Sequence, residues 1–248
     1  MDLFGLVTII LIIGIGIGII IFYNKVTPLG SSSGDGILLP LYIYPDDEIY
    51  ETVGRNMPMQ VVINPDNGNG QINEDWDRSL RLMKQAAGDK WKPLYGYVYT
   101  NYAIRPLEEV FVSIDKYMDQ FNLYVSHIFL DEVATSNVSY YELINQYVEQ
   151  KYPECRLILN PGTKPTDSKY FDLSRLYSIV VYEGPEPQEL DTLAEGVPLN
   201  KSSVIINNPR NIDPENEKFL LYKLENLGFN AYYVTSNNNY TTLPAYIN

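Results

Sequence analysis

The chain has 248 residues, with 31 Asp and Glu against 18 Lys and Arg, so its formal net charge is −13. A surface of this sign repels phosphate backbones, so no nucleic-acid partner is expected. One cysteine, Cys155, and one histidine, His127, exclude an intrachain disulfide and provide too few ligands for a zinc site. We interpret Cys155 as a buried structural thiol and His127 as a structural residue at a strand start. No metal and no cofactor are predicted.

The first predicted element is a membrane anchor. Residues Leu3 to Phe22 are uncharged and almost entirely Ile, Leu, Val, Phe and Gly. A helix of this length spans roughly 30 Å, the thickness of the hydrocarbon core. A cleaved signal peptide, the alternative, has a basic start and a shorter apolar core, whereas Asp2 precedes this run. We expect a single-pass anchor within residues 1–25, with possible self-association through Gly14 and Gly18.

A polar stretch at 26–36 is typical of a flexible linker. The orientation signals conflict. Lys25 indicates that the C-terminal side is cytoplasmic. Three Asn-x-Ser/Thr sequons, at Asn137, Asn200 and Asn239, indicate the reverse. We predict a membrane protein whose folded part lies on the extracellular or lumenal side, or on a viral or cell surface.

Eight short apolar runs follow within 37–248, and each reads as a buried strand of a parallel sheet. Proline after Asn64 and Asn160 ends two of them, because proline cannot continue a ladder. The runs are Ile37–Tyr44, Met59–Asn64, Leu94–Tyr99, Ile128–Asp131, Arg156–Asn160, Ile179–Glu183, Ser203–Asn207 and Ala231–Thr235.

Amphipathic segments with a helical period lie between most of the runs. Strand–helix alternation implies parallel crossovers, and eight repeats predict a (β/α)8 TIM-like barrel, with an open doubly wound sheet as the alternative. We expect irregularity over Pro45–Pro58 and after the eighth run, because both segments are short for full helices. The four apolar faces are Trp76/Leu80/Leu82/Met83/Ala87, Val110/Ile114/Tyr117/Met118/Phe121, Tyr141/Ile144/Val148/Tyr152 and Phe219/Tyr222/Leu224/Leu227.

Acidic residues stand at the ends of two runs. Asp131 and Glu132 follow Ile128 to Leu130, and Glu183 ends the sixth run. In α/β folds the carboxyl ends of strands are where ligands bind and reactions occur. The alternative is that these acids cap helices or pair with nearby cations. Three acids at strand ends favour a catalytic site that performs acid/base chemistry on a neutral substrate such as a glycoside.

Polar and aromatic residues end several other runs. Tyrosine at a cleft can stack on a sugar ring and bond its hydroxyls, and asparagine can aim its amide at the same face. The alternatives are core packing for the tyrosines and loop-forming hydrogen bonds for the asparagines. The candidate substrate-binding residues are Tyr42, Tyr44, Asn64, Tyr97, Thr100, Tyr102, Asn160 and Asn207.

An ordered set of motifs resembles the spherulin-4 family. The motifs are Leu39–Pro45, Val62–Gly68, Tyr95–Tyr102, Ile128–Glu132, Leu159–Thr163 and Val181–Glu183. The resemblance implies a (β/α)8 barrel near glycoside hydrolase family 135, whose fungal members are endo-acting hydrolases of galactosaminogalactan, an N-acetylgalactosamine-containing polymer. The family's catalytic acids match Asp131, Glu132 and Glu183. This chain departs from the family at Asp66–Gly70, where a Ser-Gly-Pro-Gly-like turn is usual, and the anchor is not a general family feature.

The sequence therefore predicts a membrane-anchored, endo-acting, hexosaminidase-like glycoside hydrolase whose partner is an amino-sugar polysaccharide. Successive strand residues point oppositely, so we expect Glu183 and one of Asp131 and Glu132 to form the working pair. With an N-acetyl sugar, the other acid could orient the acetamido group. The alternative is a non-catalytic glycan-binding or structural surface protein on a retained barrel.

Overall fold

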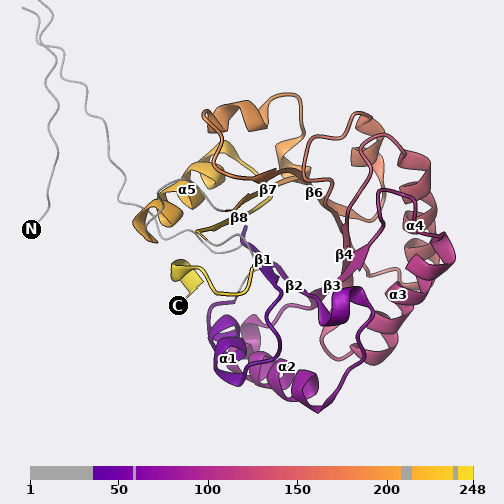
Figure 1. The fold of residues 1–248 in the computed structure, drawn as a ribbon, viewed down its shortest axis with the longest axis vertical. Coiled ribbons are helices and arrows are strands. Elements are labelled where there is room, and N and C mark those ends of the chain that lie inside the picture. The colour runs from indigo at the N-terminus through magenta and orange to yellow at the C-terminus, as the bar shows by residue number, and fades with distance from the viewer. Residues whose placement is uncertain (1–35, 58–59, 208–213, 237–239, 248) are drawn as a thin grey trace, which may run out of the picture. The chain divides into compact units, whose positions relative to one another are not determined.

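Eight parallel strands form a nearly closed barrel (Figure 1), hydrogen-bonded in the order β1 to β8. Ile37 bridges to Tyr232, whose amide donates to the Gly36 carbonyl at 2.7 Å, so the first and last strands meet. The sequential strand order confirms the TIM-like barrel in outline and excludes the doubly wound sheet. The structure is a computed structural model that describes residues 36–57, 60–207, 214–236 and 240–247.

The strands match the eight predicted runs. Two of them, β4 and β6, begin three residues earlier than predicted because their first residues are partly polar. Ser178, for example, is fully buried and is bonded to Ser203 at 2.6 Å between hydroxyl oxygens. The strands are β1 (Leu38–Leu41), β2 (Gln60–Ile63), β3 (Leu94–Tyr99), β4 (Val125–Asp131), β5 (Leu157–Leu159), β6 (Leu176–Gly184), β7 (Ser202–Asn207) and β8 (Ala231–Thr235).

The irregular connections are not all where the sequence predicted them. The first connection forms α1, which begins after Asp46, whose side chain accepts from the Ile49 amide at 3.0 Å; the prediction there is wrong. After β8 the described residues form only a short 3-10 turn, Ala245–Ile247, as expected. The connections after β5 and β6 also contain only 3-10 turns. The helices are α1 (Asp47–Arg55), α2 (Glu74–Ala87), α3 (Leu107–Gln120), α4 (Val138–Lys151) and α5 (Pro214–Leu227).

Most of the predicted apolar faces pack onto the barrel, and α3 lies so close to β3 that a Cβ on Gly96 would meet the Tyr117 ring at 2.4 Å. The face of α5 is rotated from the prediction. Phe219 is 48% exposed, whereas Glu217 is buried. The Glu217 carboxylate accepts from the backbone amides of Ser236 and Ala245, at 2.8 and 3.2 Å, so a polar residue occupies the inward face.

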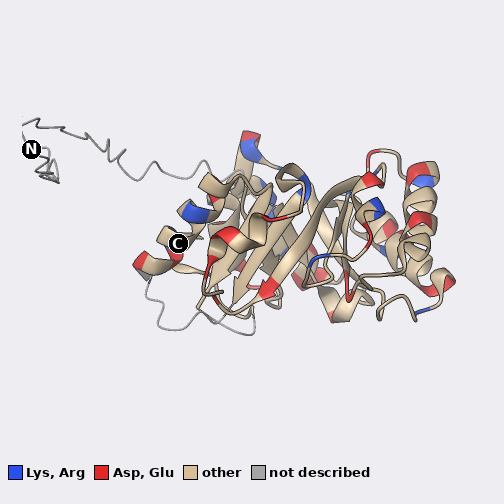
Figure 2. Ribbon diagram, turned by 90° about the horizontal axis from the view of Figure 1, so that it is seen from above, with Lys and Arg blue, Asp and Glu red and all other residues tan. Residues whose placement is uncertain are grey.

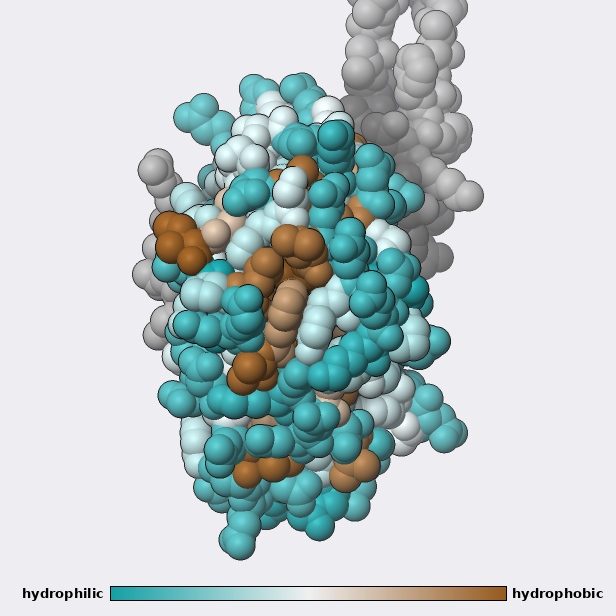
Figure 3. Space-filling model, turned by 90° about the vertical axis from the view of Figure 1, so that its right-hand side faces the viewer, coloured by the Kyte–Doolittle hydropathy of each residue, from teal (hydrophilic) through white to brown (hydrophobic). Residues whose placement is uncertain are grey.

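Acidic residues are spread over the helices and loops of the barrel (Figure 2). The side formed by α3 and α4 is mostly hydrophilic around a small apolar patch (Figure 3). In the part of the chain that the structure describes, no helix has both the length and the apolar character needed to cross a membrane. The predicted anchor, Leu3 to Phe22, and most of the linker lie outside the described residues.

Candidate active site

Two acidic side chains meet at the carboxyl end of the barrel. Asp131 is the last residue of β4, and Glu183 lies near the end of β6. Asn160, which follows β5, donates from Nδ2 to Asp131 Oδ1 at 2.8 Å and to Glu183 Oε2 at 2.6 Å. Two bonds from one amide nitrogen hold these oxygens roughly 5 Å apart. The predicted convergence of Asp131 and Glu183 is therefore observed.

Tyrosines bond the outer oxygens of both acids. The Tyr97 hydroxyl donates to Asp131 Oδ2 at 2.8 Å, and the Tyr240 hydroxyl donates to Glu183 Oε1 at 2.5 Å. Asn207 in turn donates to the Tyr240 hydroxyl at 2.9 Å. The hydrogen bonds run without a break from β3 to β7, so the positions of both carboxyl groups are set by residues of four strands and of the segments after β5 and β8.

The surroundings of Asp131 favour its protonated form. Burial raises the pKa of Asp131 to about 6, and the nearby Glu183 adds to this, while bonds from Tyr97, the Glu132 backbone and Asn160 oppose it. Burial, followed by the charge of Asp131, also raises the pKa of Tyr42 well above its ordinary value, so that phenol stays neutral. A carboxyl group that titrates near neutral pH is suited to proton transfer.

Glu132 adopts a backbone conformation that is rare for a side chain of its type. Its φ is +51°, and its carbonyl accepts from the Tyr102 amide at 2.7 Å and the Thr100 hydroxyl at 2.8 Å. This turn frees Glu132 from the strand alternation that would point it away from Asp131. Its carboxylate forms no hydrogen bond with a described residue, but it lies close enough to raise the pKa of Tyr97.

Several predicted binding residues lie around the pair. The ring of Tyr42 meets the rings of Tyr97 and Tyr240 edge-on, with 5.6 Å between centroids in each case. Tyr44 is 62% exposed and donates to Asp75 at 3.0 Å, and Tyr102 is 59% exposed in the turn beside Glu132. Tyr44 and Tyr102 are exposed and Tyr42 is half-buried, and their contact with a substrate stays a prediction.

Other predicted binding residues are structural. Thr100 is fully buried, and its hydroxyl is bonded to the Asp131 and Glu132 carbonyls and to Tyr141, which corrects the expectation that it contacts a substrate. Among the residues that the structure describes, Asn207 is linked to the acids through Tyr240. Sequence reasoning missed Tyr240 because it stands alone after the eighth run. Its only signal is its place at the carboxyl end of β8.

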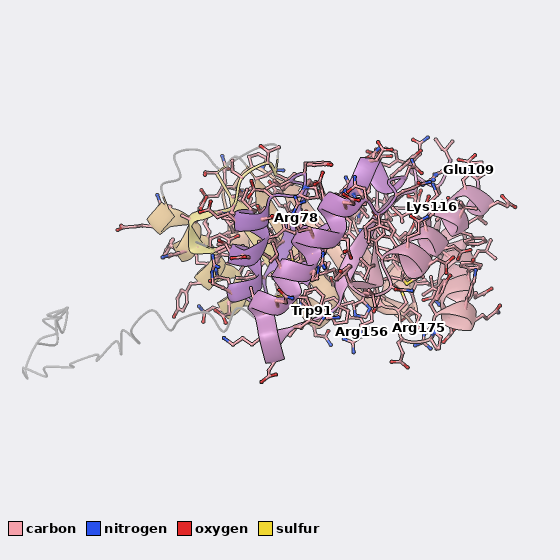
Figure 4. All side chains as sticks on the ribbon, turned by 90° about the horizontal axis from the view of Figure 1, so that it is seen from below. Arg78, Trp91, Glu109, Lys116, Arg156 and Arg175 are labelled. Carbon is pink, nitrogen blue, oxygen red and sulfur yellow. The ribbon has the colours of Figure 1, made fainter. Side chains whose placement is uncertain are left out.

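The opposite end of the barrel holds the histidine and the cysteine. The Arg156 amide donates to His127 Nδ1 at 3.2 Å, and burial, aided by the Arg156 charge, lowers the pKa of His127 to about 4. Burial raises the pKa of Cys155 to about 12. Both are structural, as predicted. Trp91, Arg156 and Arg175 lie along this end in Figure 4, and Glu109 lies toward the other.

A barrel of eight parallel strands with a hydrogen-bonded carboxyl pair at its carboxyl end defines a TIM-like protein with a candidate acid/base site. A profile of the Spherulation-specific family 4 matches residues 36–248, and the chain belongs to this family. It is 31% identical over 158 residues to Spherulin-4 of Physarum polycephalum; the match spans 62% of this chain and 46% of that protein, less than half its length.

A solved structure shares the fold. The crystal structure of Aspergillus clavatus Sph3 in complex with GalNAc matches with a TM-score of 0.71, covering 86% of this chain and 94% of that one at 22% sequence identity. At this level of identity the likeness shows a common barrel and does not transfer individual residues or an activity.

Proposed function

We propose that this protein is a glycoside hydrolase that cleaves an amino-sugar polysaccharide containing N-acetylgalactosamine or galactosamine. The observation that carries the proposal is the pair of Asp131 and Glu183, bridged by Asn160 at the carboxyl end of the barrel. Glycoside hydrolysis needs two such carboxyl groups on either side of the scissile bond. Family membership and the shared fold of Sph3, solved with GalNAc, support the choice of substrate.

In this proposal Asp131 is the proton donor, because its raised pKa keeps a proton available to the leaving oxygen. Glu183 stabilises the positive charge that develops on the sugar. The separation of roughly 5 Å between their bridged oxygens leaves no room for a water molecule between them, which supports net retention of configuration. In that case Glu183 or the acetamido oxygen of the sugar bonds to the anomeric carbon as the leaving oxygen departs with the Asp131 proton. Water, deprotonated by Asp131, then displaces that group. Glu132, whose carboxylate has no hydrogen bond to a described residue, is suited to orient the 2-acetamido group of an N-acetyl sugar.

The activity is tested by measuring reducing ends released by the full chain from a panel of amino-sugar and neutral polymers. The proposal expects release from polymers that contain galactosamine or N-acetylgalactosamine and none from neutral glucans. NMR of the first product then reports the anomer, and the α or β form of the substrate should be kept. Binding of the same polymers without any release would favour the alternative, a glycan-binding surface protein.

We also propose that Leu3 to Phe22 anchors the protein in a membrane with the barrel on its extracellular or lumenal side. The uncharged run of apolar residues supports this. Carbonate extraction of membranes from cells that make the full chain should leave the protein in the pellet. Release into the supernatant, or a mature N-terminus beyond Tyr23, would contradict an anchor.

A further inference from the structure

A groove opens beside the acid pair, at the carboxyl ends of β1 and β2. Its volume is about 610 Å³. Tyr42 belongs to both places: it lines the groove, and its ring contacts Tyr97 and Tyr240, the tyrosines that bond the two acids. A polymer whose scissile bond lies at the acids can therefore continue into this groove.

The lining of the groove suits a sugar that carries hydrogen-bond donors. Tyr42, Tyr44 and Trp76 supply aromatic surface. Asn64 also lines it, and the buried Oδ1 of Asn64 has no hydrogen-bond partner among the described residues. A donor group of a bound sugar would satisfy this oxygen. Asp66 is the only charged residue among the described residues of the lining, so the groove favours a positive ligand.

The loop that carries Asp66 is held firmly. Asp66 and Asn67 have φ values of +48° and +52°, which are unusual for side chains of this kind. Gly68 lies so close to the backbone of Tyr97 that a Cβ would meet its carbonyl oxygen at 2.6 Å, and a Cβ on Gly70 would meet Pro65 at 2.7 Å. The Asp66 carboxylate, which is exposed and has no partner among the described side chains, is thus presented from a fixed position.

We propose that this groove is a subsite for an amino sugar with a free ammonium group, and that Asp66 pairs with that group. The inference rests on the proposed function and narrows it: the preferred substrate is a partly de-N-acetylated polymer, with the charged sugar in the groove and the cleaved bond at Asp131 and Glu183. An N-acetylated sugar fits the same aromatic walls but gains nothing from Asp66.

The test compares kcat/KM of the full chain for two otherwise matched oligosaccharides, one fully N-acetylated and one partly de-N-acetylated. Wild type should prefer the second by about two- to fivefold, as expected of one exposed ion pair. Asp66→Asn should abolish this preference and Asp66→Lys should reverse it, while Asp89→Asn, an exposed carboxylate outside the groove lining, should keep it. Raising the salt concentration should shrink the wild-type preference.

Two outcomes separate the subsite from the activity. If Asp66→Asn cleaves both substrates and retains the wild-type preference, the subsite proposal is wrong, and the proposal of hydrolase activity is unaffected. If wild type cleaves neither, the hydrolase fails, and the subsite is decided by calorimetric binding of the same oligosaccharides. Binding that favours free amines in wild type but not in Asp66→Asn supports the subsite, and equal preference in both overturns it. Tyr44→Ala should weaken binding of both sugars without changing their ratio.

Discussion

Strand β4 carries a half-buried titratable group near each end, and the two groups behave differently. Burial pushes both toward their neutral forms: the pKa of His127 falls to about 4 and that of Asp131 rises to about 6. The neighbours differ. His127 faces the Arg156 cation and has its Nδ1 occupied by a backbone amide, whereas Asp131 shares a bridging amide with Glu183. Burial alone therefore does not create an acid/base site. A second carboxyl group within reach of the first is also needed.

The largest effect on activity is expected when that second carboxyl group, on Glu183, is removed. Glu183→Gln keeps the shape of the side chain but not its charge, so product release should fall about 10²- to 10⁴-fold. Polymer binding should persist. The measurement is reducing-end release by wild type and variant, with Glu154→Gln, an exposed glutamate at the amino end, as the matched control. Equal rates for Glu183→Gln and wild type would show that Glu183 is only structural.

The titratable groups at the two ends of β4 should also give the free energy of unfolding opposite dependences on pH. Asp131 holds its proton more tightly when folded, so its contribution is full below pH about 3.8 and is lost as pH rises through about 6. His127 holds its proton less tightly when folded, so its contribution is present above pH about 6.5 and is lost as pH falls toward 4. Each contribution changes by about 3 kcal/mol over its range, and the two changes have opposite signs, so the pH dependence nearly cancels in wild type between these limits.

Single substitutions should separate the contributions of Asp131 and His127 to the free energy of unfolding. From pH 6.5 to 4, the free energy of unfolding should fall for Asp131→Asn, which retains only the His127 term, and rise for His127→Gln. Urea unfolding at several pH values gives both slopes, and the difference between the variants cancels the titration of the other carboxylates. Parallel slopes for the two variants would mean that burial does not shift these groups as described.

A smaller effect is expected from Tyr240, the residue that completes the carboxyl end. Tyr240→Phe removes the hydroxyl that bonds Glu183 and Asn207, while the ring contact with Tyr42 remains. One hydrogen bond to a charged group corresponds to about 10- to 100-fold in rate. An unchanged kcat with a reduced unfolding midpoint would assign Tyr240 to packing alone.

The smallest effect on turnover is expected at Thr100. Thr100→Val removes a buried hydroxyl bonded to two backbone carbonyls and Tyr141, so we expect a stability loss of about 1–2 kcal/mol. Turnover per folded molecule should stay within about twofold, since the hydroxyl does not reach a ligand. Thermal unfolding and active-site-normalised rates measure the two quantities. A large fall in kcat with unchanged stability would restore Thr100 as a substrate contact.

Local patterns in the sequence were sufficient for the strands and for the position of the acids. Buried parallel strands are short apolar runs, and Asn-Pro marks the ends of two of them, so the eight strands could be predicted without knowledge of their contacts. Their number favoured a barrel, and the observed strand order excluded the doubly wound sheet that the sequence had left open. The same patterns placed Asp131 and Glu183 at strand ends, and hence at one face.

Tertiary structure alone decided which side chains complete the site and which do not. Asn160 bridges residues on two strands, and Tyr240 bonds Glu183 across 57 positions of the chain. Thr100 appeared equivalent to its neighbours in sequence, but its side chain is buried. On α5, Glu217 is buried because its carboxylate accepts from two backbone amides that are distant in the chain. The sequence by itself determined the strands and the end where the acids lie, because those are local properties. The hydrogen-bond partners of these acids could not be predicted from the sequence, because a hydrogen bond depends on where two residues lie in space.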